Sequence, residues 1–344
     1  MKTKIEYILN DSFDPYFNLA LEEYLFQSNN NNTYFWLWQN DNTIVIGKNQ
    51  NAFHEVDHDF MKKNNIKLAR RITGGGAVYH DLGNLNFSFI APSYNKKDYD
   101  FKHFTNQIAK ALKVFGLNAE HSGRNDLLID GKKFSGSAQF VGESKVLHHG
   151  TILFSSNLEI IGKCLTPSKE KLTAHGVSSV KSRVTLLSSY LKEPMHINDF
   201  KNKLAKEILK DYTDVNIRKL TEDEMQVVNK LRLEKFSSYE WIYGASPEFN
   251  FSKSLRFDGC GLINLSMDIK SGVINNCKIT GDFFGSGDIA ELEKLLKNTP
   301  HSKEEILAAI SSIDLNYYFN NLTLENFLLL CDMDVVPRNA RSYS

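Results

Sequence analysis

The chain has 344 residues, 42% of them hydrophobic and 24% charged, which suffices for one large globular domain and a smaller one. Lysines and arginines number 41, as do aspartates and glutamates, so the formal net charge is zero. This balance argues against an overall field that would recruit nucleic acid or a membrane surface, and we expect neither as a partner. Any anion-binding site must be local.

The four cysteines show no disulfide or metal-binding spacing. They are widely separated, and no two form a CxxC pair, which favours a reducing compartment. The N-terminal segment is polar where a signal peptide would be apolar, and no stretch approaches the length of a membrane span. We therefore expect a cytoplasmic protein. The cysteines are Cys164, Cys260, Cys277 and Cys331.

Helix and strand signals follow one another irregularly in the first part of the chain. Asp14-Pro15 has the form of an N-cap followed by a first-turn proline, which predicts a helix. The aromatic and β-branched stretches at 34–38 and 43–46 predict a hairpin. Residues 66–69 predict a strand that leads into a glycine-rich loop, and 85–90 alternates polar and apolar residues like a half-buried strand.

Further along, apolar residues over 101–115 lie on one helical stripe that ends at Gly116, a residue suited to a helix C-terminus. This pattern predicts an amphipathic helix laid on a sheet. More strands are expected at 127–129 and 151–154, and helices at 197–212 and 221–236.

The pattern changes near Ser246-Pro247. An alternating strand over 263–269, a Ser271-Gly272 turn, a second strand and two or three amphipathic helices indicate a small α+β domain. Because strands and helices do not alternate regularly, we predict mixed α+β architecture in place of a doubly wound parallel sheet. The expected division is a catalytic domain over 1–245, with mixed sheets flanked by helices, and an accessory domain over 246–344.

The segment Arg70-Arg71-Ile72-Thr73-Gly74-Gly75-Gly76 is the most informative in the chain. Consecutive glycines allow several backbone N–H groups to point at one phosphate or carboxylate, and arginines add forked, charged donors. A tight turn between strands explains the glycines equally well. The segment lacks the ending of a P-loop and the GxGxxG spacing, so it offers neither standard nucleotide site.

Two polar segments follow. Lys133 stands beside small residues, and lysine is a mobile point charge that can bridge a carboxylate and a phosphate. Asn125 and Asp126 offer oxygen ligands for Mg²⁺. Each segment alone is equally typical of a surface turn or a strand end.

Histidine and tryptophan pairs allow a further interpretation. His148 and His149 are adjacent on an expected strand, so their side chains point to opposite faces and at most one enters a site. Trp36 and Trp38 share one strand face, as core residues or as the wall of a pocket for an aliphatic ligand.

Taken together, these segments resemble the lipoate-protein ligase A family, in the same order and over nearly the whole chain. The small domain resembles the accessory domain of the two-domain ligases. The segments that carry the resemblance are 11–20, 70–84, 122–127, 133–138 and 148–151, with 241–247 and 281–284 in the region of the small domain.

The resemblance implies a biotin/lipoyl ligase-like fold and two half-reactions. Lipoate and MgATP give lipoyl-AMP and pyrophosphate, and the lipoyl group then passes to a specific lysine of an acceptor. The implied acceptors are the apo-lipoyl domains of 2-oxoacid dehydrogenase E2 subunits and the glycine-cleavage H protein. A monomer with ATP and Mg²⁺ as cofactors is expected.

The resemblance also implies residue roles. Lys133 is the expected catalytic residue, in contact with the acyl carboxylate and the α-phosphate. A hinge is expected over 237–246, and Tyr79 with Trp36 or Trp38 would line the acyl tunnel. The expected nucleotide contacts are Arg71, Gly75, Gly76, Ala77, Val78, Tyr79 and Lys133; the lipoate contacts are Arg70, Thr73, Lys133, His149 and Trp38; the metal ligands are Asn125 and Asp126.

Three alternatives stay open. Related octanoyl and lipoyl transferases use a cysteine thioester, but the position that aligns with that cysteine is Ser168, and Cys164 lies in an apolar helical context typical of a structural thiol. A ligase that uses only preformed lipoyl-AMP is the second alternative. A non-catalytic lipoate-binding partner is the third, against which the intact Arg70, Arg71 and Lys133 argue.

Overall fold

The computed structural model describes residues 4–93, 101–123, 125–164, 183–243, 251–270 and 272–331, without the side chains of 53, 54, 58, 59, 161, 162 and 164. The chain forms two compact units. Unit 1 comprises 1–45, 53–72 and 78–242, and unit 2 comprises 46–52, 73–77 and 243–344. The domain boundary predicted at 245/246 lies outside the described residues.

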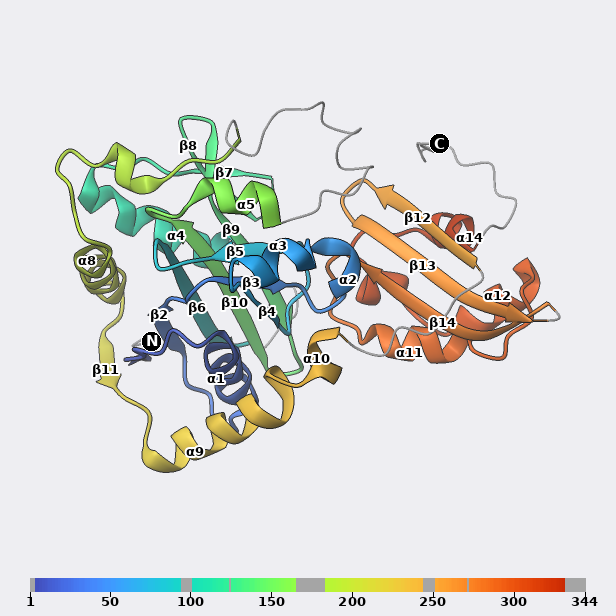
Figure 1. The fold of residues 1–344 in the computed structure, drawn as a ribbon. Helices are drawn as coiled ribbons and strands as arrows, with labels where there is room; N and C mark the ends of the chain where they lie inside the picture. Colours follow the sequence, from blue (N-terminus) through green and yellow to red (C-terminus); the bar gives the residue numbers. More distant parts are fainter. Residues whose placement is uncertain are drawn as a thin grey trace. The chain divides into compact units, whose positions relative to one another are not determined.

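An eight-stranded mixed sheet organises unit 1, in the order β11-β1-β2-β6-β10-β9-β8-β7 (Figure 1). The strand β1 runs parallel to both of its neighbours, and the other described pairs are antiparallel. The strands are β1 (Lys4–Ile8), β2 (Tyr34–Trp38), β6 (Asn84–Pro92), β7 (Glu120–Ser122), β8 (Asp126–Ile129), β9 (Lys132–Val141), β10 (Lys145–Leu153) and β11 (Asp214–Arg218).

A second sheet has the order β4-β3-β5, formed by β3 (Thr43–Ile46), β4 (Lys67–Arg70) and β5 (Val78–His80). The predicted hairpin of 34–38 with 43–46 is therefore wrong, because β2 pairs with β1 and β6 whereas β3 pairs with β5. All five residues of β2 are buried, which requires neighbours on both edges, and these come from distant parts of the chain. The glycine loop joins β4 to β5, and β6 follows.

The first helix, α1 (Pro15–Gln27), begins as predicted, since the Asp14 side chain accepts a hydrogen bond from the Tyr16 N–H. The helix α4 (Phe101–Leu112) and a 3₁₀ turn (Lys113–Phe115) end at Gly116, whose φ of 75° needs a residue without Cβ. Both predictions are confirmed.

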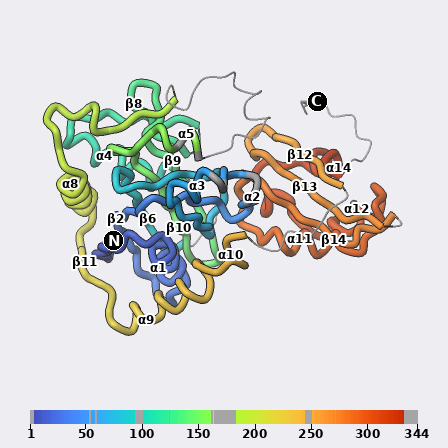
Figure 2. Tube along the Cα trace, in the orientation of Figure 1, coloured from blue at the N-terminus to red at the C-terminus, as the bar shows by residue number. Residues whose placement is uncertain are grey.

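The capping box predicted at the start of α9 (Glu222–Leu231) is also present, with both reciprocal hydrogen bonds between Thr221 and Glu224. A π-helical turn (Arg232–Phe236) and the short α10 (Tyr239–Tyr243) follow, a course that Figure 2 traces. The other helical segments of this part of the chain are α2 (Ala52–Glu55), α3 (His58–Lys63), α5 (Leu158–Cys164), a 3₁₀ turn (Leu187–Tyr190) and α8 (Ile197–Leu209).

The two faces of the large sheet pack against different helices. On the apolar face, Phe87 and Phe89 join α4 and α8 in a core of phenylalanines and aliphatic side chains. On the opposite face, here called the α1 face, α1 packs on β6 and β10, and Trp36 and Trp38 are buried with it. Alternation along each strand sends neighbouring residues to these different environments.

Unit 2 contains an antiparallel sheet in the order β12-β13-β14 and a separate apolar core. The small α+β architecture and its two predicted strands are confirmed. The strand β12 was missed because its inward residues are only half-buried, and the described residues of unit 2 contain four helical segments where two or three were expected. These elements are β12 (Phe251–Phe257), β13 (Gly261–Lys270), β14 (Val273–Gly281), α11 (Ile289–Leu296), α12 (Lys303–Ile310), α13 (Leu315–Tyr318) and α14 (Leu324–Leu330).

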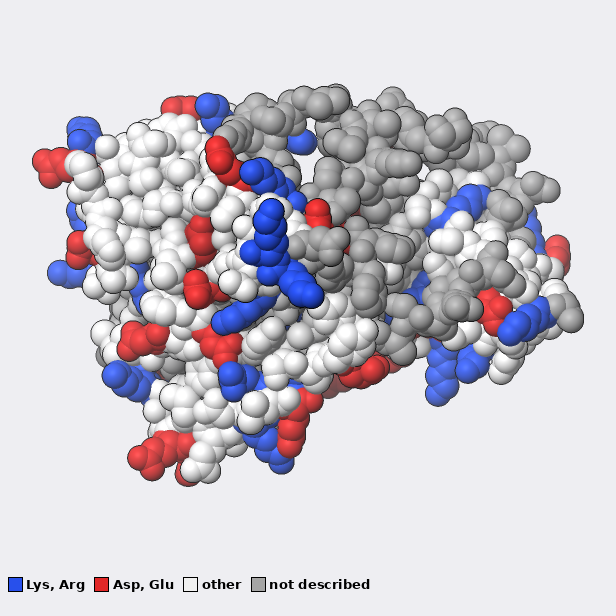
Figure 3. Space-filling view, viewed as in Figure 1, with Lys and Arg blue, Asp and Glu red and all other residues white. Residues whose placement is uncertain are grey.

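In the parts of the chain that the structure describes, no helix combines the length and apolarity that a bilayer crossing requires. Acidic and basic side chains are interspersed over the face of unit 1 in Figure 3, in keeping with the zero formal net charge.

Candidate active site

Lys133 and Asp126 meet at the junction of β8 and β9. The Lys133 Nζ lies 2.8 Å from the Asp126 Oδ1, and both side chains are partly exposed. Asp126 pairs with Gly136 in the strand register. A Cβ on Gly136 would stand 3.0 Å from the Lys133 Nζ, so the absence of a side chain there makes room for the ammonium. The junction thus presents a cation and a carboxylate together, as the segment spacing suggested.

Asn125 holds the chain that leads into this junction, because its Nδ2 donates to the Ser137 carbonyl oxygen over 3.0 Å. The buried Asp126 Oδ1 receives no hydrogen bond from the groups described, apart from its contact with the ammonium. The ammonium is therefore the one described group that balances this oxygen.

A row of residues crosses the α1 face from this junction. The Thr151 Oγ1 lies 3.4 Å from the Gly136 nitrogen, Thr151 stands opposite Asn86 in the register, and Asn86 stands opposite Trp38. Directly opposed residues project from the same face of a sheet. The row, which we call the polar lane, comprises Gly136, Thr151, Asn86 and Trp38, and it begins beside Lys133.

A second row runs parallel to the polar lane and is closed by α1. Glu22 of α1 is fully buried, and its Oε1 accepts from the Ser88 hydroxyl at 2.6 Å and lies 2.8 Å from the His149 Nδ1. The Trp38 Nε1 donates to the Ser88 hydroxyl at 2.8 Å. These bonds hold the His149 ring and the Trp38 indole in fixed orientations.

The two adjacent histidines point to opposite faces, as predicted. His149 joins Glu22 on the α1 face, whereas His148 stacks on Phe104 with ring centroids 4.9 Å apart on the apolar face. Burial lowers the pKa of His148 well below its usual value. His148 is therefore a neutral core residue.

Sequence reasoning missed Glu22, Asn86 and Ser88. The signal was the alternation in 85–90, but a half-buried strand was the wrong interpretation, because every residue from Asn84 to Ala91 is buried. The polar side chains of β6 face the interior under α1 and do not reach solvent. Buried polar residues at alternate positions indicate a ligand site more strongly than a solvated strand.

Arg70 is anchored on the end of α10. Its Nε donates to the Trp241 carbonyl oxygen at 3.0 Å and its Nη2 to the Ile242 carbonyl oxygen at 2.6 Å, while the Trp241 indole donates to the Arg70 carbonyl oxygen at 2.9 Å. Burial lowers the pKa of Arg70 to about 10. This anchor fixes the position where the chain leaves β4.

Arg71 is buried as well, and its Nη1 donates to the Val45 carbonyl oxygen at 3.2 Å. Burial is the main reason that its pKa falls to about 10, and the Glu22 carboxylate opposes that decrease. The guanidinium stays charged at neutral pH and acts on the same buried region as Glu22 and His149.

Tyr79 and His80 of β5 are both tied to asparagines. The Tyr79 hydroxyl donates to the Asn42 Oδ1 at 2.9 Å, and the His80 Nδ1 lies 3.0 Å from the Asn40 Nδ2. Burial, with contributions from Arg71 and His149, lowers the pKa of His80 to about 3. His80 is thus neutral at physiological pH. Val78, the remaining predicted contact of β5, is half-buried.

The glycine loop, 73–77, lies in unit 2. The Lys48 N–H donates to the buried Thr73 carbonyl oxygen at 2.8 Å, and Gly75 has a φ of 90°. A Cβ on Gly74 would stand 2.8 Å from the Phe283 carbonyl oxygen, whereas one on Gly76 would meet nothing within 4 Å. Gly74 is therefore required by packing and Gly75 by its backbone angle, whereas Gly76 has room for a side chain.

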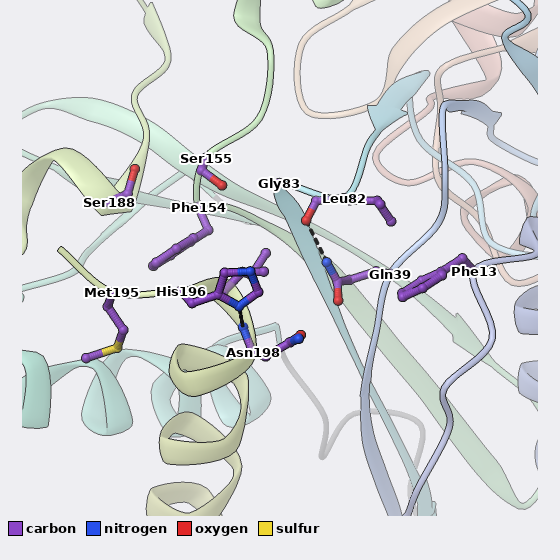
Figure 4. Close-up of a pocket in the computed structure, with 11 residues that line it drawn as sticks. Phe13, Gln39, Leu82, Gly83, Phe154, Ser155, Ser188, Met195, His196 and Asn198 are labelled. Atoms are coloured by element: carbon purple, nitrogen blue, oxygen red, sulfur yellow. Dashed lines mark hydrogen bonds between the residues drawn. The ribbon is translucent and has the colours of Figure 1, made fainter.

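Two cavities among the described residues of unit 1 lie away from the predicted site residues. One of about 380 Å³ is bordered by Phe13, Leu82 and the start of α8, where the Gln39 side chain donates to the Leu82 carbonyl oxygen (Figure 4). Another of about 370 Å³ lies between α8 and the β11 edge. Neither contains a residue of the polar lane.

Several predicted positions lie outside what the structure describes. Ser168 belongs to the segment 165–182, part of the expected hinge belongs to 244–250, and the side chain of Cys164 is not described. Their sequence-based interpretations stay predictions.

Comparison with known proteins identifies the family. Residues 14–209 match the lipoyl protein ligase A/B catalytic domain, and residues 246–330 match the bacterial lipoate protein ligase C-terminus. The lipoate-protein ligase LplJ of Bacillus subtilis is 39% identical over 92% of this chain and 96% of its own length. Lipoate–protein ligase 1 of Staphylococcus aureus is 37% identical over 93% and 98%.

Similar solved structures support the same family. P. falciparum LipL1 in complex with lipoate superimposes with a TM-score of 0.77 at 27% identity, over 94% of this chain and 96% of that one. Lipoate-protein ligase A bound with ATP gives a TM-score of 0.61 at 28% identity, over 71% and 99%.

The fold and the matched segments thus define a protein ligase of the lipoyl type. The chain belongs to the lipoyl protein ligase A/B family, and the expected enzyme class, a lipoate-protein ligase, is confirmed.

Proposed function

We propose that this chain activates lipoate with ATP, releases pyrophosphate, and transfers the lipoyl group from lipoyl-AMP to a lysine of an acceptor protein in the cytoplasm. The observation that carries the proposal is the Lys133 ammonium beside Asp126 at the start of a buried lane of polar and aromatic side chains. Family membership supplies the reaction, and this geometry supports where in unit 1 the acyl group would bind.

The chemistry requires position and charge more than a protein nucleophile. A carboxylate does not acylate an amine at neutral pH, and adenylation converts it into a mixed anhydride with AMP as leaving group. Negative charge develops on the α-phosphate while pyrophosphate leaves, so a fixed cation lowers the barrier. We assign this role to Lys133, whose ammonium would exchange Asp126 for the acyl carboxylate and the α-phosphate.

Nucleotide contacts are proposed for Arg71 and for the segment from Gly75 to Tyr79. The charged, buried guanidinium of Arg71 and the space beside Gly76, where an added Cβ would meet nothing within 4 Å, support this assignment. Lipoate contacts are proposed for His149, Trp38 and Thr73. Arg70 would contact the acyl-adenylate only by giving up its bonds to the α10 carbonyl groups.

Magnesium fits the junction as part of MgATP. Within the described residues there is no cluster of three or more acidic, histidine or cysteine side chains, so a cage made by the protein alone is not offered there. Mg²⁺ is commonly held by one or two carboxylates together with substrate phosphates and water. Asp126 and Asn125 would hold the ion, which would neutralise phosphate charge, once the Asp126 carboxylate has exchanged its contact with the Lys133 ammonium.

Apo-lipoyl domains of 2-oxoacid dehydrogenase E2 subunits and the glycine-cleavage H protein are the proposed acceptors. In support, a bipartite lipoate protein ligase from Thermoplasma acidophilum, described with its E2 lipoyl domain, superimposes with a TM-score of 0.64 at 29% identity, over 73% of this chain and all of that one. We propose that the chain acts as a monomer.

A cysteine-dependent transferase is the less favoured mechanism. The described cysteine side chains, Cys260, Cys277 and Cys331, are buried in unit 2. Burial raises the pKa of Cys277 above its usual value and that of Cys331 to about 12, whereas a nucleophilic thiol needs a lowered pKa.

The test uses the full chain with lipoate, ATP, Mg²⁺ and an apo-lipoyl domain. We expect the mass of the domain to rise by one lipoyl group, with release of pyrophosphate. Activity with synthetic lipoyl-AMP but none with lipoate and ATP would support the alternative of a ligase that only transfers. Inactivity with both, despite measurable lipoate binding, would support a non-catalytic lipoate-binding partner.

A further inference from the structure

Asn86 is the member of the polar lane with an unused donor. Its side chain is 1% exposed, and its Nδ2 has no hydrogen-bond partner among the groups described. The Asn84 Nδ2 donates to the Asn86 Oδ1 at 2.9 Å, so the carbonyl end of this carboxamide is held and the NH₂ end is presented. A buried, unpaired donor is unfavourable because it has lost its hydrogen bonds to water, and a bound ligand with an acceptor can recover that free energy.

On the same face the Asn84 Oδ1 and the Trp36 Nε1 also lack a partner among the groups described, whereas the side chains around Glu22 are satisfied. In the next row, Glu22, Ser88 and His149 bond to one another, and the Trp38 indole donates to Ser88. None of these bonds uses the Asn86 amide. The free donor is thus a local feature of the lane, between Thr151 on one side and the Trp38 ring on the other.

The distance from Lys133 on β9 to Asn86 on β6 determines which part of the substrate lies beside Asn86. Asn86 on β6 is two strands away from β9, which carries Lys133, and two strand spacings amount to about 10 Å. An extended lipoate is of comparable length. With its carboxylate at the Lys133 ammonium, the dithiolane ring would lie over β6, beside the Asn86 amide.

We propose that Asn86 is a specificity-determining residue that favours lipoate over octanoate, because its Nδ2 donates to a sulfur of the dithiolane ring. This inference rests on the proposed function. Sulfur is a weak acceptor, but octanoate has only methylene and methyl groups at the same depth and leaves the donor unpaired. A site that presents a buried donor discriminates against the analogue without an acceptor more strongly than a purely apolar pocket does.

The experiment compares kcat/KM for lipoate and for octanoate in the wild type and in Asn86→Leu, which has similar volume and no donor. We expect the lipoate-to-octanoate ratio to fall about tenfold, mainly because octanoate becomes a better substrate. The matched control is Ser93→Ala, which removes another unpartnered buried donor just beyond the far end of β6. Its ratio should stay within about twofold of the wild type.

An unchanged ratio in a folded Asn86→Leu protein would overturn the inference, and so would an equal loss with both acids. If Asn86→Leu does not fold, Asn86→Ala gives the same comparison, supplemented by calorimetric affinities for the two acids. Failure of the proposed function looks different, because the wild type would then ligate neither acid with ATP.

Discussion

The two faces of the large sheet in unit 1 are equally buried but built from different chemistry. On the apolar face, Phe87, Phe89 and Phe104 pack as in an ordinary core, and His148 is a flat ring in the stack. The α1 face carries Glu22 and a lane of polar side chains with unpaired atoms. Alternate residues of the same strands therefore lie in different environments, and we propose that the set on the α1 face contacts the ligand.

This comparison is tested most strongly by Phe87→Ala. The Phe87 ring fills the space over Gly150, where a Cβ would come within 2.4 Å of it. Truncation on the apolar face should cost about 3–5 kcal/mol of the free energy of unfolding. Denaturant unfolding measures the loss, and ligation by the remaining folded protein at low temperature should be little changed. A stable but inactive variant would contradict the division between the faces.

Lys133→Ala should produce the converse result. We expect kcat/KM for adenylation to fall at least a hundredfold, about 3 kcal/mol of transition-state stabilisation, with less than 1 kcal/mol of change in stability. Pyrophosphate release measures the activity. Lys133 pairs with Asp126 in a partly exposed position, and Lys132→Ala, at the exposed neighbouring position, serves as the control for the loss of one positive charge from β9. Near-normal turnover by Lys133→Ala would remove it from its proposed role.

Glu22→Gln tests the region where α1 closes the site. The variant keeps the shape of the side chain but removes the negative charge. That charge orients the His149 ring and counteracts the decrease that burial causes in the pKa of Arg71. We expect KM for lipoate to rise about tenfold, as is common when a group that orients a binding residue is neutralised. The same substitution at Glu224, in the capping box of α9, is the control, and it should not affect KM.

The pH dependence of the free energy of unfolding should show that His80 and His148 are neutral in the folded protein. The pKa of His80 is lowered to about 3 and that of His148 well below its usual value, so the unfolded chain binds more protons than the folded one below about pH 6.5. Stability should decrease as pH falls through this range, by up to about 1.4 kcal/mol per pH unit for each histidine. His148→Gln and His80→Gln should each make the free energy of unfolding, measured with denaturant, depend less on pH between pH 6.5 and 5. If neither substitution changes this dependence, the two histidines are not buried as neutral rings.

Trp241→Phe should have the smallest effect. It removes only the indole donor to the Arg70 carbonyl oxygen and keeps an aromatic ring against Phe236. We expect a loss of about 1 kcal/mol in stability and a change in adenylation rate of no more than about threefold. A loss comparable with that of Lys133→Ala would show that the anchor of Arg70 on α10 is part of the catalytic machinery.

Local signals in the sequence predicted the local features well. The Asp14 cap, the Gly116 end of α4 and the Thr221 capping box each depend on a few neighbouring residues, and each is present. The order of motifs also identified the family. The proposed hairpin of 34–38 with 43–46 failed because strand pairing depends on partners far apart in the chain.

Only the tertiary structure decided which buried residues face α1. The alternation in β6 was visible in the sequence, but whether its polar side chains meet water or a buried site depends on a helix about 60 residues earlier in the chain, whose Glu22 hydrogen-bonds Ser88. The sequence likewise showed that position 133 is a lysine and carries a positive charge. Its pairing with Asp126 could be seen only from the register of the strands. Residue identities and short-range spacing are properties of the sequence, and the environment of a side chain arises when distant segments pack together.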